Sequence, residues 1–185
     1  MLFRSTLRGA VNQVMQQLTT QGITGRHQPR QLAPAAGDGD GLEDDEPQLD
    51  PRYAPAQDAL ERGDIDGAVA EYQKLLDANP ADAEAAGGLA IAKVMQRTQG
   101  VDLNAARAAA ADAPDDVDAQ TLVADLDMLG GHVEDAFARL VNLVARTSDK
   151  DREKARDHLL GLFAAVGNDD PRVLASRRSL ASALF

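Results

Sequence analysis

The chain has 185 residues, no cysteine, 44% hydrophobic residues and only 3% aromatic residues, and its net charge is -11. The acidic balance opposes binding to nucleic acids and to anionic membranes, and the absence of thiols excludes disulfides, thiolate nucleophiles and cysteine-ligated metals. Much of the apolar fraction is alanine, which suits closely packed helices better than a sheet core rich in Val, Ile and aromatic residues.

The first fifty residues divide into a helix and a linker. Apolar residues at spacings of three and four predict an amphipathic helix within residues 1–25, and Gly22 and Gly25 end it. Residues 26–50 contain prolines, glycines and few large apolar side chains, which predicts a disordered acidic linker. Its acidic residues are Asp38, Asp40, Glu43, Asp44, Asp45 and Glu46. We interpret it as a solvated spacer, the alternative being an acidic tail that binds basic partners.

A repeat begins after residue 50. Residues 63–80 align without gaps with residues 131–148 at an offset of 68, which is twice 34, and Pro80 and Pro114 are themselves 34 residues apart. This is the length of a tetratricopeptide repeat. The pattern predicts first and second helices over about residues 51–62 and 65–78.

Each position in the repeat has a structural reason. Gly63 and Gly131 suit turns with positive φ between antiparallel helices, and Asp64 can cap the second helix. Ala68 and Ala136 are expected at helix crossings, where a larger side chain would push the helices apart. Pro80 and Pro114 are expected to end one helix pair and precede the next.

The middle and the end of the chain are also predicted to be helical. A long helix over residues 82–98 precedes a short, alanine-rich helix near residues 102–113, whose packing we expect to be weak. Residues 149–166 form a further helix that Gly167 ends. Pro171 begins the last helix, with Asp169 or Asp170 as its cap. The last helix ends on Leu184 and Phe185, which we expect to be buried.

Residues 51–185 resemble the tetratricopeptide family in the small, turn, aromatic and break positions occupied by Ala56, Gly63, Ala68, Tyr72 and Pro80. The resemblance implies an all-α, tetratricopeptide-like α-solenoid of about three helix pairs, preceded by the separate helix and the linker. Such a solenoid has a concave groove lined by first helices. The groove candidates are Tyr53, Gln57, Glu84, Gly88, Ile91, Thr121 and Met128. For some of them, above all Ile91 and Met128, the alternative is a purely structural role in the core.

The C-terminal segment is similar to the ending of the chaperedoxins, which are thioredoxin-like co-chaperones. The residues that carry this resemblance are Ala155, Arg156, Leu159, Leu160, Phe163, Gly167, Asp170, Pro171, Arg177, Arg178, Leu180, Ser182, Leu184 and Phe185. Residues 7–26 also look like the last thioredoxin helix of that family and the start of its linker. The resemblance implies binding of unfolded clients or chaperones in the cytoplasm.

The thioredoxin strands and a Cys-x-x-Cys motif are absent from this sequence. The chain is therefore expected to be either a natural short form or one whose start lies inside a longer gene. Without a thiol it cannot exchange disulfides. The alternatives to a co-chaperone are a part of a thioredoxin-family oxidoreductase and a passive repeat scaffold. The oligomeric state is left open.

The sequence predicts no enzyme activity, no cofactor and no metal site. His27, His132 and His158 lack partners at metal-ligand spacing and are interpreted as surface or interface residues. The acidic run at residues 115–118 resembles part of a calcium loop, but helix capping explains it better. Glycines that alternate with aspartates at residues 37–41 do not form a phosphate cradle, because local negative charge would repel the ligand.

Overall fold

The structure, a computed structural model, describes residues 50–184. The predictions for residues 1–25 and 26–49, and for Phe185, lie outside these residues. All regular structure in the described part is helical. Its elements are η1 (Pro51–Tyr53), α2 (Ala54–Glu61), α3 (Ile65–Ala78), α4 (Ala83–Thr98), α5 (Leu103–Asp112), α6 (Val117–Leu129), α7 (Val133–Arg146), α8 (Asp149–Val166) and α9 (Pro171–Leu184).

The helix boundaries follow the predicted capping and turn residues. Asp64 accepts a hydrogen bond from the backbone N–H of Gly67 at 2.8 Å, which caps α3. Gly63 and Gly131 have φ values of 75° and 81°, a conformation that glycine adopts at little cost. Pro80 lies in the turn before α4, and Pro114 lies in the turn before α6. The helix pairs predicted from the repeat are therefore confirmed.

The two alanines at the repeat positions are fully buried, as predicted. Ala68 and Ala136 are both 0% exposed, and they lie in different core clusters. The N-terminal cluster joins η1, α2, α3 and the first half of α4, and it includes Tyr72 and Leu89. The C-terminal cluster is larger and is formed mainly by α6 to α9. Small side chains at the crossings allow the helices to approach closely.

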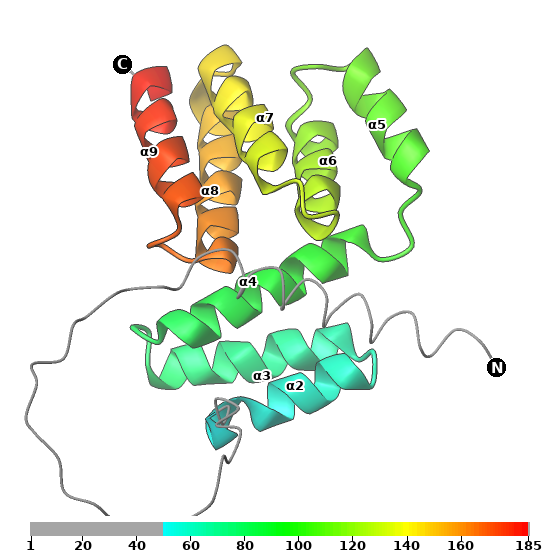
Figure 1. Cartoon of the computed structure of the whole chain (residues 1–185). Coiled ribbons are helices and arrows are strands. Elements are labelled where there is room, and N and C mark those ends of the chain that lie inside the picture. Colours follow the sequence, from blue (N-terminus) through cyan, green and yellow to red (C-terminus); the bar gives the residue numbers. More distant parts are fainter. Residues whose placement is uncertain (1–49, 185) are drawn as a thin grey trace, which may run out of the picture. The chain divides into compact units, whose positions relative to one another are not determined.

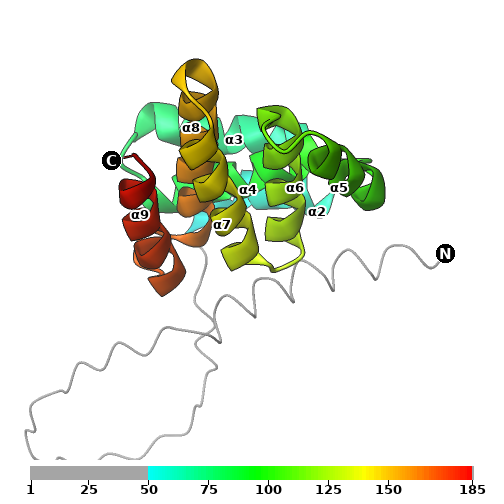
Figure 2. The same cartoon turned by 90° about the horizontal axis from the view of Figure 1, so that it is seen from above.

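Helix α4 connects the two cores (Figure 1). It packs on α3 and also contacts α6 and α8, and it contributes Val94 to the C-terminal cluster. Helix α7 packs on α6, α8 and α9, so it is the central helix of the C-terminal half, as the view from above also shows (Figure 2). The all-α solenoid of stacked helix pairs predicted from the sequence is what the structure has.

Helix α5 departs from the regular stacking of helix pairs. It packs mainly on α6 and lies away from α4, its predecessor in the chain (Figure 1). Its buried residues are only the small Ala106 and Ala110, which form a minor cluster with Val123 of α6. The weak attachment of α5 leaves space between α5 and α7, and this space contains the pocket described below.

The C-terminus is held by α9. Asp170 accepts a hydrogen bond from the backbone N–H of Arg172 at 2.8 Å, so of the two predicted caps it is Asp170 that contacts the start of this helix. Leu184 is half-buried and packs against the C-terminal cluster, which is less burial than predicted. A helix end has neighbours on one side only, which explains the partial exposure.

Two glycines within helices give a matched pair of predictions. A Cβ on Gly88 in α4 would lie 2.4 Å from the ring of the buried Tyr72, whereas a Cβ on Gly161 in α8 would meet nothing within 4 Å. We expect Gly88→Ala to lower the free energy of unfolding by about 1–2 kcal/mol, because overpacking exceeds the gain in helix propensity. Gly161→Ala should raise it by up to about 1 kcal/mol. Urea denaturation of both variants would check this, and stabilisation by Gly88→Ala would contradict the close approach.

Candidate functional site

The predicted groove residues fall into two groups in the structure. Tyr53 and Thr121 are buried, Met128 packs against the C-terminal cluster, and the backbone of Gly88 lies against the Tyr72 ring. Gln57 and Ile91 are half-buried, and Glu84 is exposed. Gly88 and Met128 are half-buried too, so the candidates that are not buried are Gln57, Glu84, Gly88, Ile91 and Met128. A role of these residues in binding stays a prediction.

Tyr53 fixes the start of α4 through Asp82. The Tyr53 hydroxyl donates a 2.8 Å hydrogen bond to Asp82, which also accepts one from the backbone N–H of Ala85 at 3.0 Å. The hydrogen bond to Asp82 raises the pKa of Tyr53 to about 12. The backbone hydrogen bond from Ala85, followed by that from Tyr53, lowers the pKa of the Asp82 carboxyl. These contacts give Tyr53 a structural role whether or not it also contacts a partner.

A buried carboxylate connects three helices. Asp125 of α6 is 0% exposed and accepts hydrogen bonds from Arg97 of α4 at 2.6 and 3.0 Å. The Nε2 atom of His158 in α8 lies 2.8 Å from Oδ1 of this carboxylate, the oxygen that also accepts from Nη2 of Arg97. Burial by itself raises the pKa of Asp125, but the hydrogen bonds from His158 and Arg97 outweigh it, so the net shift is downward. This cluster is saturated by its own contacts and has a structural role.

The residues considered for metal binding have other positions. His158 is held at the helix interface by Asp125, and His132 is an exposed residue directly before α7. Asp116 caps α6 by accepting a hydrogen bond from the backbone N–H of Ala119 at 3.0 Å, as the capping interpretation predicted. Within residues 50–184, no group of three His, Cys, Asp or Glu side chains is placed to hold a metal ion.

A pocket of about 420 Å³ lies where α5 and α7 both pack on α6. Arginines from two helices line it, together with polar and acidic residues. The lining residues are Arg107, Gln120, Asp127, Asp135, Ala138, Arg139, Asn142 and Arg146. None of the predicted groove residues is among them. The pocket is lined by the second helices α5 and α7 together with Gln120 and Asp127 of the first helix α6, whereas the predicted groove is lined by first helices alone.

The buried carboxylate of Asp127 contacts two of the arginines in this pocket. Asp127 is 4% exposed and accepts a hydrogen bond from Arg107 at 3.0 Å. Arg139 approaches the other oxygen of Asp127, with its Nε at 3.5 Å. This contact is an ion pair but is too poorly placed to satisfy the buried Nε–H, which has no hydrogen-bond partner. The two guanidinium groups therefore have more positive charge and more donors than Asp127 can match.

The remaining contacts fix the frame of the pocket. Gln120 donates a 2.6 Å hydrogen bond to the carbonyl oxygen of Ala110 and accepts one of 2.9 Å from Arg139, so it ties α5 to α7 through α6. Arg146 donates to the carbonyl oxygen of Pro114 at 2.6 Å and forms an exposed ion pair with Asp115. Gln120 thus positions Arg139, and the carbonyl oxygen of Pro114 positions Arg146.

A sequence signal for this pocket exists but is local and weak. Asp135, Arg139, Asn142 and Arg146 recur at spacings of four, three and four, which places them on one polar face of α7. Such a stripe is ordinarily read as the solvent face of an amphipathic helix. Arg107 comes from a separate alanine-rich helix, and no sequence rule places it opposite that stripe.

Comparison with known proteins agrees with the fold. Residues 96–185 match a family model described as tetratricopeptide repeat. The chain thus contains a tetratricopeptide-type repeat region, and regions of this type generally mediate protein–protein interactions. No helix among the described residues is long and apolar enough to cross a membrane.

The similar curated proteins are mycobacterial. The chain is 38% identical over 138 residues to the uncharacterized protein Rv1324 of Mycobacterium tuberculosis, and equally to the uncharacterized protein Mb1359 of Mycobacterium bovis. The match covers 75% of this chain and 45% of each relative, so the chain spans less than half the length of these relatives. No solved structure matches the chain.

Proposed function

We propose that this chain is the partner-binding region of a co-chaperone that holds partly unfolded client proteins or passes them to a chaperone. The observation that carries the proposal is the repeat region at residues 96–185, which includes the final helix pair that resembles the chaperedoxin ending. Stacked helices with an exposed surface can bind an extended or partly folded polypeptide without any catalytic group. The proposed location is the cytoplasm, where a cysteine-free chain needs no oxidising compartment.

The length of the relatives supports a larger assembly. More than half of each mycobacterial relative lies outside the region that this chain matches, which leaves room for a further domain. We propose that this further domain is thioredoxin-like, as the resemblance implies. The present chain would then supply the partner-binding function of such a protein and not its redox chemistry.

An aggregation assay tests the proposal. The full chain is mixed at equimolar ratio with a heat-labile client, and light scattering is followed on heating. We expect a delayed rise in scattering. Ile91→Asp, which places a charge in the predicted groove, should shorten the delay, whereas Leu174→Asp on the exposed face of α9 should not. No delay with the native chain would contradict holdase action.

Two further assays separate the alternatives. An oxidoreductase part would act only beside a separate thioredoxin domain, and because this chain has no cysteine, the chain by itself should not reduce insulin disulfides. Insulin reduction by the purified chain would therefore overturn the co-chaperone proposal. A passive scaffold predicts neither delayed aggregation nor a retained partner in a pull-down, so failure of both would favour the scaffold.

A further inference from the structure

We propose that the pocket between α5 and α7, the arginine pocket, binds an acidic segment of a partner polypeptide through Arg107, Arg139 and Arg146. The inference rests on the proposed function only in taking the ligand to be a protein. The ligand class is an extended peptide that carries several Asp or Glu side chains. This site lies outside the groove predicted from the sequence.

Unused hydrogen-bond donors are the first argument. Arg107 is about half exposed and uses one terminal nitrogen on Asp127, which leaves most of its guanidinium donors free. The buried Nε–H of Arg139 has no hydrogen-bond partner, although it lies next to Asp127. The buried Nε–H shows that Asp127 does not match both arginines, but a ligand cannot reach it. A guanidinium group presents donors in a planar fork that matches a carboxylate, so an incoming carboxylate can pair with the free donors of the half-exposed Arg107.

Charge is the second argument. The lining itself contains three arginines and two aspartates, an excess of one positive charge, which in the unbound chain of net charge -11 is offset, among residues 50–184, only by the exposed pair between Arg146 and Asp115. That local excess attracts an acidic segment, while the negative surroundings disfavour a long polyanion such as a nucleic acid. The lining also contains Asn142, whose exposed amide has no hydrogen-bond partner within residues 50–184 and can bond a peptide backbone.

The spacing of the arginines favours an extended acidic segment of the partner as the ligand over the single carboxylate of a partner's C-terminus. Arg139 and Arg146 are two turns apart on α7, which corresponds to about 10 Å along the helix axis. An extended peptide advances about 3.1–3.3 Å per residue, so side chains three residues apart span the same distance. The exposed ion pair between Arg146 and Asp115 is a weak one that a partner carboxylate can replace.

Asp135 provides a prediction that a structural role would not give. It lines the pocket, is exposed and forms no ion pair within residues 50–184, so its charge repels an acidic ligand. Removal of its charge should therefore tighten binding. A variant that gains affinity cannot be explained by damage to the fold.

The experiment measures binding of fluorescein-labelled peptides to the full chain by fluorescence anisotropy. The probe is a short Asp/Glu-rich peptide with an amidated C-terminus, compared with its Asn/Gln counterpart. We expect the acidic peptide alone to bind, with an affinity that falls as salt is added. Arg107→Gln and Arg146→Gln should each weaken binding about tenfold, and Asp135→Asn should tighten it about threefold.

Matched variants and probes make each outcome decisive. Arg62→Gln removes an exposed arginine outside the pocket and should leave binding unchanged. Arg107→Lys should retain part of the affinity lost in Arg107→Gln, because the charge remains. Thermal unfolding checks that every variant is folded. If the arginine variants fail to fold, the inference is still tested by the tighter peptide binding expected for Asp135→Asn and by the salt dependence of peptide binding to the native chain.

Several results would overturn the inference. The first is that the acidic peptide does not bind. The second is that Arg107→Gln and Arg146→Gln bind the acidic peptide as tightly as the native chain does. The third is that a phosphopeptide binds and the acidic peptide does not. Equal binding of a neutral peptide with a free C-terminus would assign the site to chain termini instead. A chain that delays aggregation but binds no acidic peptide would refute only this inference, and the reverse would refute only the co-chaperone proposal.

Discussion

Replacement of Phe163 by alanine is expected to lower the free energy of unfolding by about 4 kcal/mol. Phe163 of α8 is 0% exposed, and its ring meets that of Phe137 of α7 edge to face at 4.9 Å. The guanidinium group of Arg177 in α9 lies 5.2 Å from the same ring. One side chain thus joins three helices, and its removal leaves a cavity that fixed helices on all sides cannot close.

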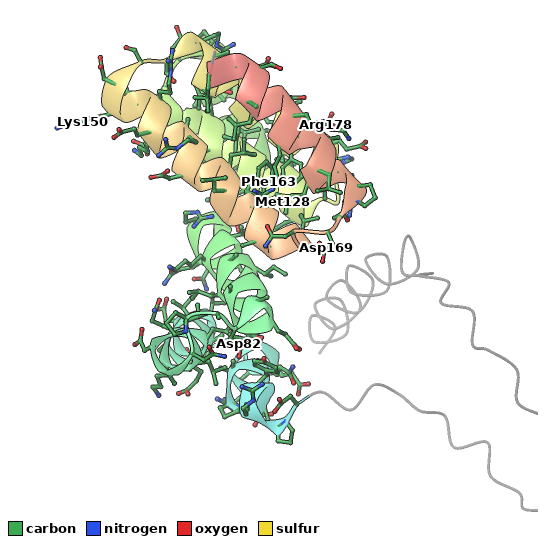
Figure 3. All side chains as sticks on the ribbon, turned by 90° about the vertical axis from the view of Figure 1, so that its left-hand side faces the viewer. Asp82, Met128, Lys150, Phe163, Asp169 and Arg178 are labelled. Carbon is green, nitrogen blue, oxygen red and sulfur yellow. The ribbon has the colours of Figure 1, made fainter. Side chains whose placement is uncertain are left out.

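The setting of Phe163 in the interior is visible in Figure 3, where Arg178 projects from the outer face of α9. Phe163→Leu is the matched variant, because it keeps most of the apolar volume, and it should cost less than half as much as alanine. Urea denaturation followed by circular dichroism gives both values. A loss below about 1 kcal/mol for Phe163→Ala would contradict the packing described here.

The helices of this protein are predictable because their determinants are local. Asp64, Gly63 and Pro80 act within a few residues of where they stand, and each has its predicted place at a helix boundary. Ala68 and Ala136 are predictable for a different reason, because they occupy equivalent positions in the sequence repeat and each lies where two helices cross. The weak packing of α5 follows from its alanine-rich composition alone.

The polar contacts between helices are not predictable in this way. Asp125 finds Arg97 and His158 at sequence separations of 28 and 33 residues, and neither separation corresponds to the repeat period. His158 stands in a charged stretch that indicates a solvated helix face, yet its side chain is only 15% exposed because α8 turns it toward α6. Sequence periodicity gives the apolar face of a helix but not the neighbour that its polar face meets.

The arginine pocket, like the contacts of Asp125, depends on how the helices pack on one another and could not be predicted from the sequence. Arg107 faces Arg139 because α5 is displaced toward α6, and that displacement results from packing between helices. A regular helix pair would have placed α5 beside α4. The departure from the repeat therefore creates the pocket, and a prediction based on the regular repeat could not contain it.

Replacement of Asp125 by alanine is expected to lower the free energy of unfolding by about 3 kcal/mol near neutral pH. The variant leaves Arg97 and His158 without their shared acceptor and opens a gap where α4, α6 and α8 meet. Asp118→Asn is the matched control on the same helix, since Asp118 is exposed and its ion pair with Lys154 is at the surface. That control should change stability by less than about 0.5 kcal/mol.

The effect of Asp125 should also depend on pH in a defined direction. Because the pKa of Asp125 is lowered in the folded protein, its carboxylate stabilises the native state above its unfolded pKa of about 3.9. This contribution is lost as the pH falls through the still lower folded pKa. Urea denaturation of the native chain and of Asp125→Asn at successive pH values should give two curves that lie apart near neutral pH and approach each other in acid. A constant separation down to the lowest pH would contradict the lowered pKa of Asp125, because the difference between the two side chains would then not depend on ionisation of the carboxyl.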